Sequence, residues 1–297
     1  MPAPGDAYGN EVWADTPNWW WRSDEATGVG GPVDYMGGPN GTYAGPPTIN
    51  QPPLILTGKS VLYDGVDDGA FWADAAAHRP TLLMVELWLD PDPTIANFAP
   101  ALIKANSSWT NGYGMVWVSG QLRWFINNYT TASASVSNHI DATIPSGGSH
   151  VIGMFNGSQM RMFTDGVEVA GSPVALTAAI NHDATVPLRV GFDGAGDWWK
   201  GKIDEPAIYG SIFSSPSGRV ITHYSTGSGA EVFVDLAAES VSDSEDTAVL
   251  STVAAEAAIG SGHWGLTLNG DPLPVPEGLM PATSLDSTTL LDAGGVA

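Results

Sequence analysis

Cysteine is absent from the 297 residues, and basic residues are scarce, with 10 Lys and Arg against 32 Asp and Glu. Without cysteine the chain has no disulfide, no thiolate metal site and no cysteine nucleophile. A formal net charge of −22 disfavours binding to the phosphates of nucleic acid and to anionic membranes. No apolar run approaches the length of a transmembrane helix. We therefore expect a soluble protein with neither nucleic acid nor membrane as a partner.

A secretory signal is also absent from the first residues, MPAPGDAYGNEVW, which contain neither a basic nor an apolar stretch. We expect the protein to be carried on a larger particle, or otherwise to be extracellular by another route. Glycine and proline, in contrast, are abundant, with 36 and 22 residues. Because helix interiors tolerate few of either, this composition favours a turn-rich β protein.

Hairpin signals recur along the middle of the chain. The segment GMVWVSGQLRWFIN, residues 114–127, has two alternating runs around Ser119-Gly120. Asn156-Gly157 and Asp165-Gly166 separate further short apolar runs, and such pairs accept the positive φ of tight turns. An apolar run at 81–89 suits a strand buried in a sheet. We predict antiparallel sheets that contain these hairpins.

Four ordered stretches carry a family pattern: YDGVDD at 63–68, LLMVELWLDP at 82–91, SHVIGMFNGSQMRMFTDGVEVAG at 149–171, and LRVGFDGAGDWWKGKIDEPAIYGSIFSSPSGRVITHY at 188–224. Together they resemble the laminin-G-like domains of the concanavalin A-like jelly rolls. The resemblance implies an all-β sandwich of two antiparallel sheets over residues 13–228, with a short helix that begins near Ser214. A fold of this kind does not fix an activity.

The two ends of the chain differ from this middle. Residues 1–12 show no periodicity and are expected to form a short arm. Residues 229–297 contain eleven acids and neither Lys nor Arg, half of the net charge. An amphipathic pattern near AVLSTVAAEAAIG predicts one helix there. We expect this acidic extension to serve assembly, by self-association or by docking on another protein.

Carboxylates for glycoside hydrolysis are not suitably spaced. An acid and a nucleophile on one strand must share a face, as residues i and i+2 do. Asp204 and Glu205 are adjacent, and Glu86 stands alone in its strand. No G-x-S-x-G elbow is present, and the histidines lack the spacing of a zinc site. We expect no enzymatic activity, and a glycan-active enzyme is the least favoured interpretation.

Metal binding is expected, through the resemblance, as a structural calcium ion held by Asp34 and Asp204. The alternative for Asp204 is that it accepts backbone N–H bonds or pairs with Arg22 or Lys202. The acids Asp64, Asp67 and Asp68 are either turn formers or calcium ligands at the rim.

A sugar site would combine polar groups with an exposed aromatic face. The candidates near expected loops and hairpins are Trp109, Trp117, Trp124, Tyr129, Trp198 and Trp199. The alternative is that most of these rings belong to the core. We expect Trp117 to point outward, and at least one of Trp198 and Trp199 to face solvent because they follow a Gly/Asp turn. For Trp19–Trp21 we expect alternate rings to be buried and exposed, or an exposed aromatic platform.

The whole layout resembles laminin-G-like minor tail proteins of phages that infect high-GC Gram-positive bacteria. This implies a virion structural protein, a minor tail or decoration protein, that displays its sandwich for adhesion to host surface glycans. Other virion proteins would then be its partners. A free bacterial carbohydrate-binding lectin module is the alternative.

Overall fold

The computed structural model describes residues 2–25, 30–127, 138–213 and 216–230, together with two short strands further along the chain. The chain divides into two units, Met1–Ala230 and Glu231–Ala297. In the second unit, Thr267–Leu268 (β17) pairs antiparallel with Asp271–Pro272 (β18). The helix predicted in the acidic extension lies outside the described residues.

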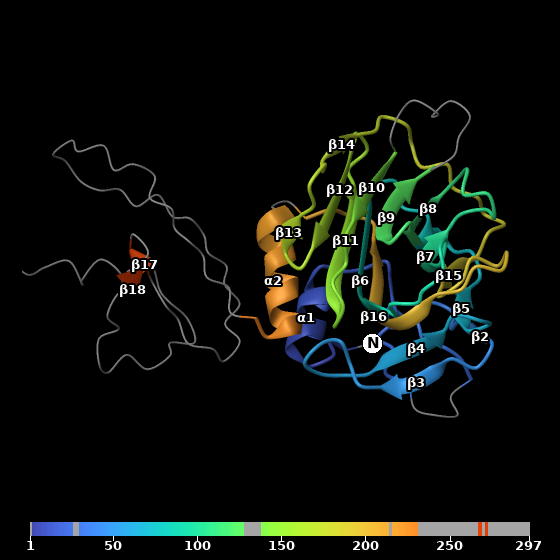
Figure 1. Cartoon of the computed structure of the whole chain (residues 1–297), viewed down its shortest axis with the longest axis horizontal. Coiled ribbons are helices and arrows are strands. Elements are labelled where there is room, and N and C mark those ends of the chain that lie inside the picture. The colour runs from blue at the N-terminus through green and yellow to red at the C-terminus, as the bar shows by residue number, and fades with distance from the viewer. Residues whose placement is uncertain are drawn as a thin grey trace, which may run out of the picture. The chain divides into compact units, whose positions relative to one another are not determined.

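Two antiparallel sheets make up the first unit (Figure 1). Sheet A has the strand order β13-β12-β11-β6-β16-β4-β3, with β1 beside β16 and β14 beside β12. Its strands are Trp19–Trp20 (β1), Thr48–Gln51 (β3), Ser60–Asp64 (β4), Leu83–Pro91 (β6), Ser149–Phe155 (β11), Gln159–Thr164 (β12), Val167–Glu168 (β13), Val174–Ala175 (β14) and Lys200–Tyr209 (β16). The long strands β6 and β16 pair at its centre, with a register shift between Asp204 and Ala207.

Sheet B has the strand order β10-β9-β8-β7-β15-β5-β2. Its strands are Thr42–Ala44 (β2), Gly69–Trp72 (β5), Pro100–Lys104 (β7), Tyr113–Val118 (β8), Gln121–Ile126 (β9), His139–Ala142 (β10) and Leu188–Val190 (β15). Alternate side chains of both sheets meet in one buried cluster, as the packing of a two-layer sandwich requires: Val85 and Leu87 come from sheet A, and Met115 and Trp124 from sheet B. The predicted all-β sandwich is confirmed.

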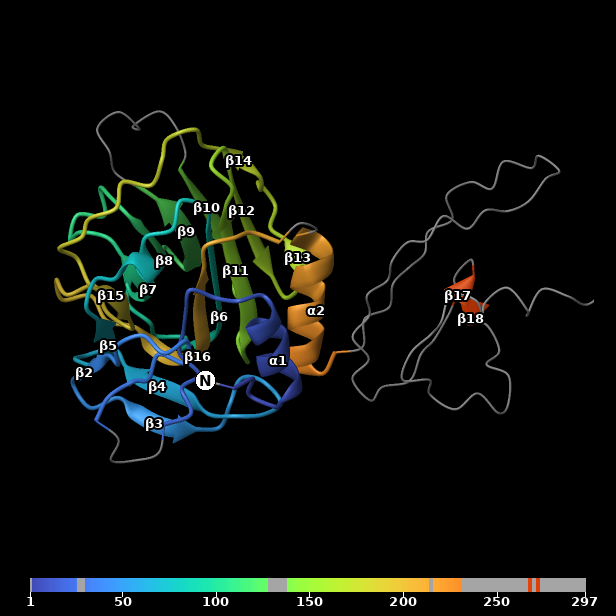
Figure 2. The ribbon, with the colours of Figure 1, turned by 180° about the vertical axis from the view of Figure 1, so that it is seen from behind.

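Two helices cover the outer face of sheet A, and Figures 1 and 2 show them side by side. They are Ala7–Ala14 (α1) and Pro216–Ser228 (α2), and a 3-10 turn spans Ala76–His78 (η1). The second helix confirms the one predicted near Ser214. Both helices bury side chains, including Tyr8, Val12 and Val220, against apolar residues of sheet A. Neither helix has the length and apolarity needed to cross a membrane in the part of the chain described.

The expectation of an irregular arm at residues 1–12 is wrong for its second half. Asp6 caps α1 by accepting a hydrogen bond from the Gly9 N–H at 2.8 Å. Tyr8 and Val12 are four residues apart, so they fall on one face of the helix, and both are buried. The two apolar contacts are too few to show as a periodic pattern in the sequence.

The three predicted hairpin turns are present. Strands β8 and β9 are joined at Ser119-Gly120, β11 and β12 at Asn156-Gly157, and β12 and β13 at Asp165-Gly166. Both residues of the Asp165-Gly166 turn have positive φ, 50° and 84°, as the tight turns favoured between antiparallel strands require. The sequence therefore predicted the register at Ser119-Gly120 and Asp165-Gly166, whereas four residues, 156–159, separate the paired Phe155 and Met160.

Candidate functional site

The predicted calcium ligands Asp34 and Asp204 lie in positions where backbone groups already bond them. Asp34 is 4% exposed, and its Oδ1 accepts from the Met36 N–H at 2.9 Å. Asp204 is fully buried on β16, and its Oδ2 accepts from the Leu54 N–H at 3.0 Å. In the described residues, neither acid belongs to a group of three acidic or histidine side chains that could hold an ion. The alternative interpretation of Asp204, as an acceptor of backbone N–H bonds, matches its contacts.

A guanidinium supplies the positive charge beside the adjacent acids of β16. The Nε of Arg22 lies 3.3 Å from Glu205 Oε1, and its Nη2 lies 2.8 Å from Asp6 Oδ2 and 3.4 Å from Asp24 Oδ2. Glu205 also accepts from the Trp20 Nε1–H at 2.7 Å. Arg22 therefore already forms ion pairs with the carboxylates that a calcium ion at this point would need as ligands.

Burial acts on both acids of β16. It raises the pKa of Asp204 and of Glu205, and Arg22 opposes the rise at each. Calcium prefers ionised carboxylates, and burial favours the neutral form of Asp204. Because neither Asp34 nor Asp204 lies in a group of three possible ligands among the described residues, they do not form the calcium site that the resemblance implies.

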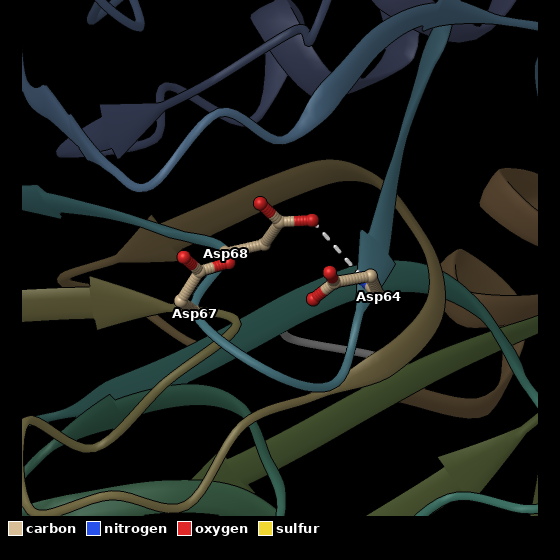
Figure 3. Close-up of side chains that lie close together, drawn as sticks. All are labelled: Asp64, Asp67 and Asp68. Carbon is tan, nitrogen blue, oxygen red and sulfur yellow. Dashed lines mark hydrogen bonds between the residues drawn. The ribbon is translucent and has the colours of Figure 1, made fainter.

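The turn between β4 and β5 brings three acids together (Figure 3). Carboxylate oxygens of Asp64, Asp67 and Asp68 lie within 4.8 Å of one another. Asp68 Oδ2 accepts from the Asp64 N–H at 3.1 Å, and Asp64 Oδ1 accepts from the Val66 N–H at 2.8 Å. Burial and the two neighbouring acids raise the pKa of Asp68. The turn-former interpretation therefore holds for Asp64 and Asp68, while oxygens of the kind that calcium prefers remain at the turn.

Most of the aromatic candidates are buried, which corrects the prediction that they bind a ligand. Trp124 and Trp199 have no exposed surface, because they fill the core between the sheets. Trp109 is 5% exposed, and its ring stacks on Phe125 with centroids 5.8 Å apart. Trp117 does not point outward but packs, half-buried, against the core. The sixth candidate, Tyr129, lies outside the described residues.

Trp198 is partly exposed, as Trp117 is, but it does not pack against the core between the sheets. Its ring stacks on Phe192 with centroids 5.1 Å apart and an interplanar angle of 7°. A Cβ at Gly69 would lie 2.2 Å from the Phe192 ring, so the glycine at the start of β5 makes room for this pair. Phe71, two residues further along β5, meets Phe192 edge-on at 6.3 Å. These rings form an aromatic patch, defined here by Phe71, Phe192 and Trp198.

The aromatic patch belongs to the outer face of sheet B. Directly paired residues point to the same face, and one such row crosses all seven described strands. It runs through Thr42, Phe71, Arg189, Ile103, Gly114, Phe125 and His139. Leu188 and Val190, on either side of Arg189, point into the core. Two clusters thus lie on this face, the aromatic patch over β5 and β15 and the Trp109 cluster over β7 to β9.

Arg189 completes the surroundings of the aromatic patch, and the prediction from sequence missed it. Its Cζ lies 5.9 Å from the centre of the Phe192 ring, within the range of a cation–π contact. Burial lowers the pKa of Arg189, against the opposing effect of Asp193. The alternation Leu188, Arg189, Val190 in the sequence carried a signal, since a polar residue between two buried apolar residues must point away from the core.

A second constellation of titratable groups surrounds Glu86, which is fully buried on the outer face of sheet A. Its carboxylate lies 2.7 Å from His150 Nε2 and 2.7 Å from His223 Nδ1. The hydroxyls of Tyr8 and Tyr209 donate to it at 2.9 and 2.5 Å. Because α1 and α2 cover this group, which we call the Glu86 network, no substrate has access to it. The arrangement fastens the helices to the sheet.

A comparison with known protein families identifies the superfamily to which this fold belongs. A family model described as the concanavalin A-like lectin/glucanases superfamily matches residues 40–217. The chain belongs to this superfamily. No curated protein sequence matches the chain at a significant level.

Solved structures of the same fold include parts of glycosidases and of a toxin. Domain 4 of the arabinanase AbnA from Geobacillus stearothermophilus, in complex with arabinotriose, is 16% identical with a TM-score of 0.53, and the match covers 70% of this chain and 98% of that domain. The binding domain of botulinum neurotoxin DC, in complex with rat synaptotagmin II, is 10% identical with a TM-score of 0.54, over 71% and 52% of the two chains. Trypanosoma rangeli sialidase in complex with 2,3-difluorosialic acid is 16% identical with a TM-score of 0.51, over 70% and 32%. At these identities the likeness concerns the fold alone.

Proposed function

We propose that this protein is a non-enzymatic glycan-binding sandwich whose ligand lies on the outer face of sheet B, against the aromatic patch. The observation that carries the proposal is the partly exposed indole of Trp198, held flat on Phe192. A pyranose ring offers a patch of C–H groups to such a face and hydroxyls to polar groups beside it. Binding of this kind agrees with the lectin/glucanase superfamily of this chain and with the arabinanase domain of similar fold, which was solved with arabinotriose.

The absence of enzymatic activity is part of this proposal. Glycoside hydrolysis needs two carboxyl groups that flank the scissile bond. Asp204, Glu205 and Glu86 are at most 1% exposed, so a sugar cannot reach them. On the outer face of sheet B, Asp141 is held by Arg123, whose Nε and Nη2 each lie 2.8 Å from its oxygens. An ion-paired carboxylate is a weak nucleophile and a weak general acid.

Replacing Trp198 by alanine is expected to weaken binding on a glycan array about tenfold or more, because the stacking surface is lost. Leu82, which is 38% exposed and precedes β6 of sheet A, supplies the matched control Leu82→Ala. Thermal unfolding of both variants checks that the sandwich remains folded. An array on which the wild type binds no glycan, or on which Trp198→Ala binds as well as the wild type, contradicts the proposal.

Calcium remains a proposal, with its ligands moved to the turn of Asp64, Asp67 and Asp68. No Lys or Arg side chain forms an ion pair with these acids among the described residues. We expect millimolar calcium to raise the melting temperature of the wild type, since an ion would offset the repulsion between the three carboxylates. Asp67→Asn should abolish this rise, whereas Asp165→Asn, in another hairpin turn, should not. An equal rise in Asp67→Asn would place the ion elsewhere.

We further propose that the protein is a component of a phage particle, where it displays its sandwich for adhesion to host surface glycans. The support is the resemblance in layout to laminin-G-like minor tail proteins and the base-free acidic stretch after residue 229. Mass spectrometry of density-purified particles should detect the chain at a fixed ratio to the major tail protein. Recovery of the chain only in the particle-free fraction would contradict this role and favour a free lectin.

A further inference from the structure

Arg189 differs from every other arginine of the chain in its partners. The other five each lie within 4.0 Å of a carboxylate: Arg22, Arg79, Arg123, Arg161 and Arg219. Arg189 forms no such ion pair and no side-chain hydrogen bond with any residue that the structure describes. In a chain with 32 acids and 10 bases, an arginine that meets no acid is exceptional.

The Arg189 side chain is nevertheless held in place. It extends from the outer face of β15 across the Phe192 ring, and the loop 191–199 folds against it. A Cβ at Gly194 would lie 2.9 Å from Arg189 Nε, and Gly194 has a φ of +82° that few other residues adopt. The glycine therefore allows the loop backbone to approach the guanidinium, which limits the positions that the side chain can take.

Asp193, the acid whose charge acts on Arg189, is bound to its own loop. Its Oδ1 accepts from the N–H groups of Ala195, Gly196 and Asp197 at 2.7, 3.1 and 3.2 Å. These bonds fix the carboxylate within the turn, beyond ion-pair distance of Arg189, so that it acts on the guanidinium only through its field. Half-buried and without a direct counterion, Arg189 keeps N–H donors for a group from outside the chain.

We propose that Arg189 and the Phe192–Trp198 pair form a subsite for an acidic saccharide, in which the guanidinium binds the sugar carboxylate and the indole stacks on the sugar ring. The proposal rests on the proposed function and names its ligand class. A planar guanidinium matches a carboxylate with two parallel N–H···O bonds, which a neutral hydroxyl cannot accept with equal strength. The aromatic neighbours supply the contact with the C–H face of the ring.

The test uses the full chain and two pairs of immobilised probes, sialyllactose with lactose, and trigalacturonate with its methyl ester. The wild type should bind at least one acidic probe about 10- to 100-fold more tightly than its neutral counterpart, as expected for one charge-assisted bidentate contact. Arg189→Gln should remove this preference and leave the affinity for the neutral probe unchanged. Arg189→Lys should retain part of the preference, because it keeps the charge but loses the paired donors. Trp198→Ala should weaken binding of both members of a pair.

Arg161 gives the matched control, because it lies on sheet A and pairs with Glu168 at 3.3 Å. Arg161→Gln should bind all four probes as the wild type does. Equal affinity of the wild type for acidic and neutral probes, or an unchanged preference in Arg189→Gln, overturns the acidic subsite and leaves the glycan-binding function standing. Absence of binding to every probe and to every glycan of the array overturns both.

Discussion

Replacing Glu86 by alanine is expected to lower the free energy of unfolding by about 3–5 kcal/mol, as for removal of one partner of a buried ion pair. Glu86 accepts the two tyrosine hydroxyls and contacts both His150 and His223 at 2.7 Å. All of these groups are buried, so the variant removes one of the two carboxylates that contact His223 and leaves several donors without a partner. Urea unfolding followed by tryptophan fluorescence measures the change.

Two further variants separate the charge of Glu86 from its packing. Glu86→Gln keeps the size and one acceptor, and should lose part of the stability because it cannot balance His223. Glu168→Ala removes the half-buried partner of Arg161 on β13, and should change stability by at most about 1 kcal/mol. A loss of less than about 1 kcal/mol in Glu86→Ala would show that the network does not fasten the helices.

The Glu86 network connects five elements that are distant in the chain. His223 of α2 contacts Glu86 of β6 on one side and Asp15, which follows α1, at 2.8 Å on the other. Arg219, one turn earlier in α2, pairs with Asp15 at 2.9 Å and with Glu11 of α1. His150 brings in β11, and Tyr209 brings in β16. The helices are thus attached to sheet A by charge as well as by apolar contact.

Local patterns in the sequence were enough to predict antiparallel hairpins, and the family resemblance added the two-sheet sandwich. The Asp165-Gly166 turn and the apolar run of β6 are short-range signals, because each depends on backbone preference or on burial of one strand. The family stretch at 188–224 also contains β16. What that stretch could not reveal is that Arg22, distant in the sequence, places its guanidinium beside the acids of β16.

The exposure of side chains was predicted less well, because it depends on which elements pack over each sheet, and this cannot be read from local sequence patterns. Trp19, Trp20 and Trp21 are all fully buried, since strand β1 lies between the core and a second apolar layer under α1 and α2. Alternate exposure of Trp19–Trp21 would be correct for a strand with apolar residues packed on one side only, but β1 has an apolar cluster on both sides. Arg189 was overlooked because it is distinguished by the lack of an ion pair. Ion pairs can be assigned only once the pairing of the strands is known.

Stability is expected to fall as the pH rises from about 6.5 to 9, owing to His223. The charge of Glu86 and the bonds to Asp15 and Glu86 raise the pKa of His223 from 6.5 to about 9, despite burial. The folded state therefore retains a proton that the unfolded state releases, and stabilisation that is complete below pH 6.5 is lost as the pH passes through 9. At 1.36 kcal/mol per pKa unit, the loss amounts to about 3 kcal/mol. Urea unfolding at a series of pH values measures it.

His78, His182, Tyr8 and Tyr209 act outside this pH window. Burial lowers the pKa of His78 to about 4 and lowers that of His182, so their stabilisation is lost only as the pH falls below 6.5. Burial and Glu86 raise the pKa of Tyr8 and Tyr209, so these act above pH 10.

His223→Gln should consequently be less stable than the wild type at pH 6, and its stability should fall less than that of the wild type between pH 7 and 9. His182→Gln should keep the alkaline decline of the wild type, because its own titration belongs to the acid side. An alkaline decline of the same size in His223→Gln would mean that another group releases the proton. Since Glu86 holds its charge throughout this range, Glu86→Gln should also make the decline smaller, while Asp15 continues to raise the pKa of His223.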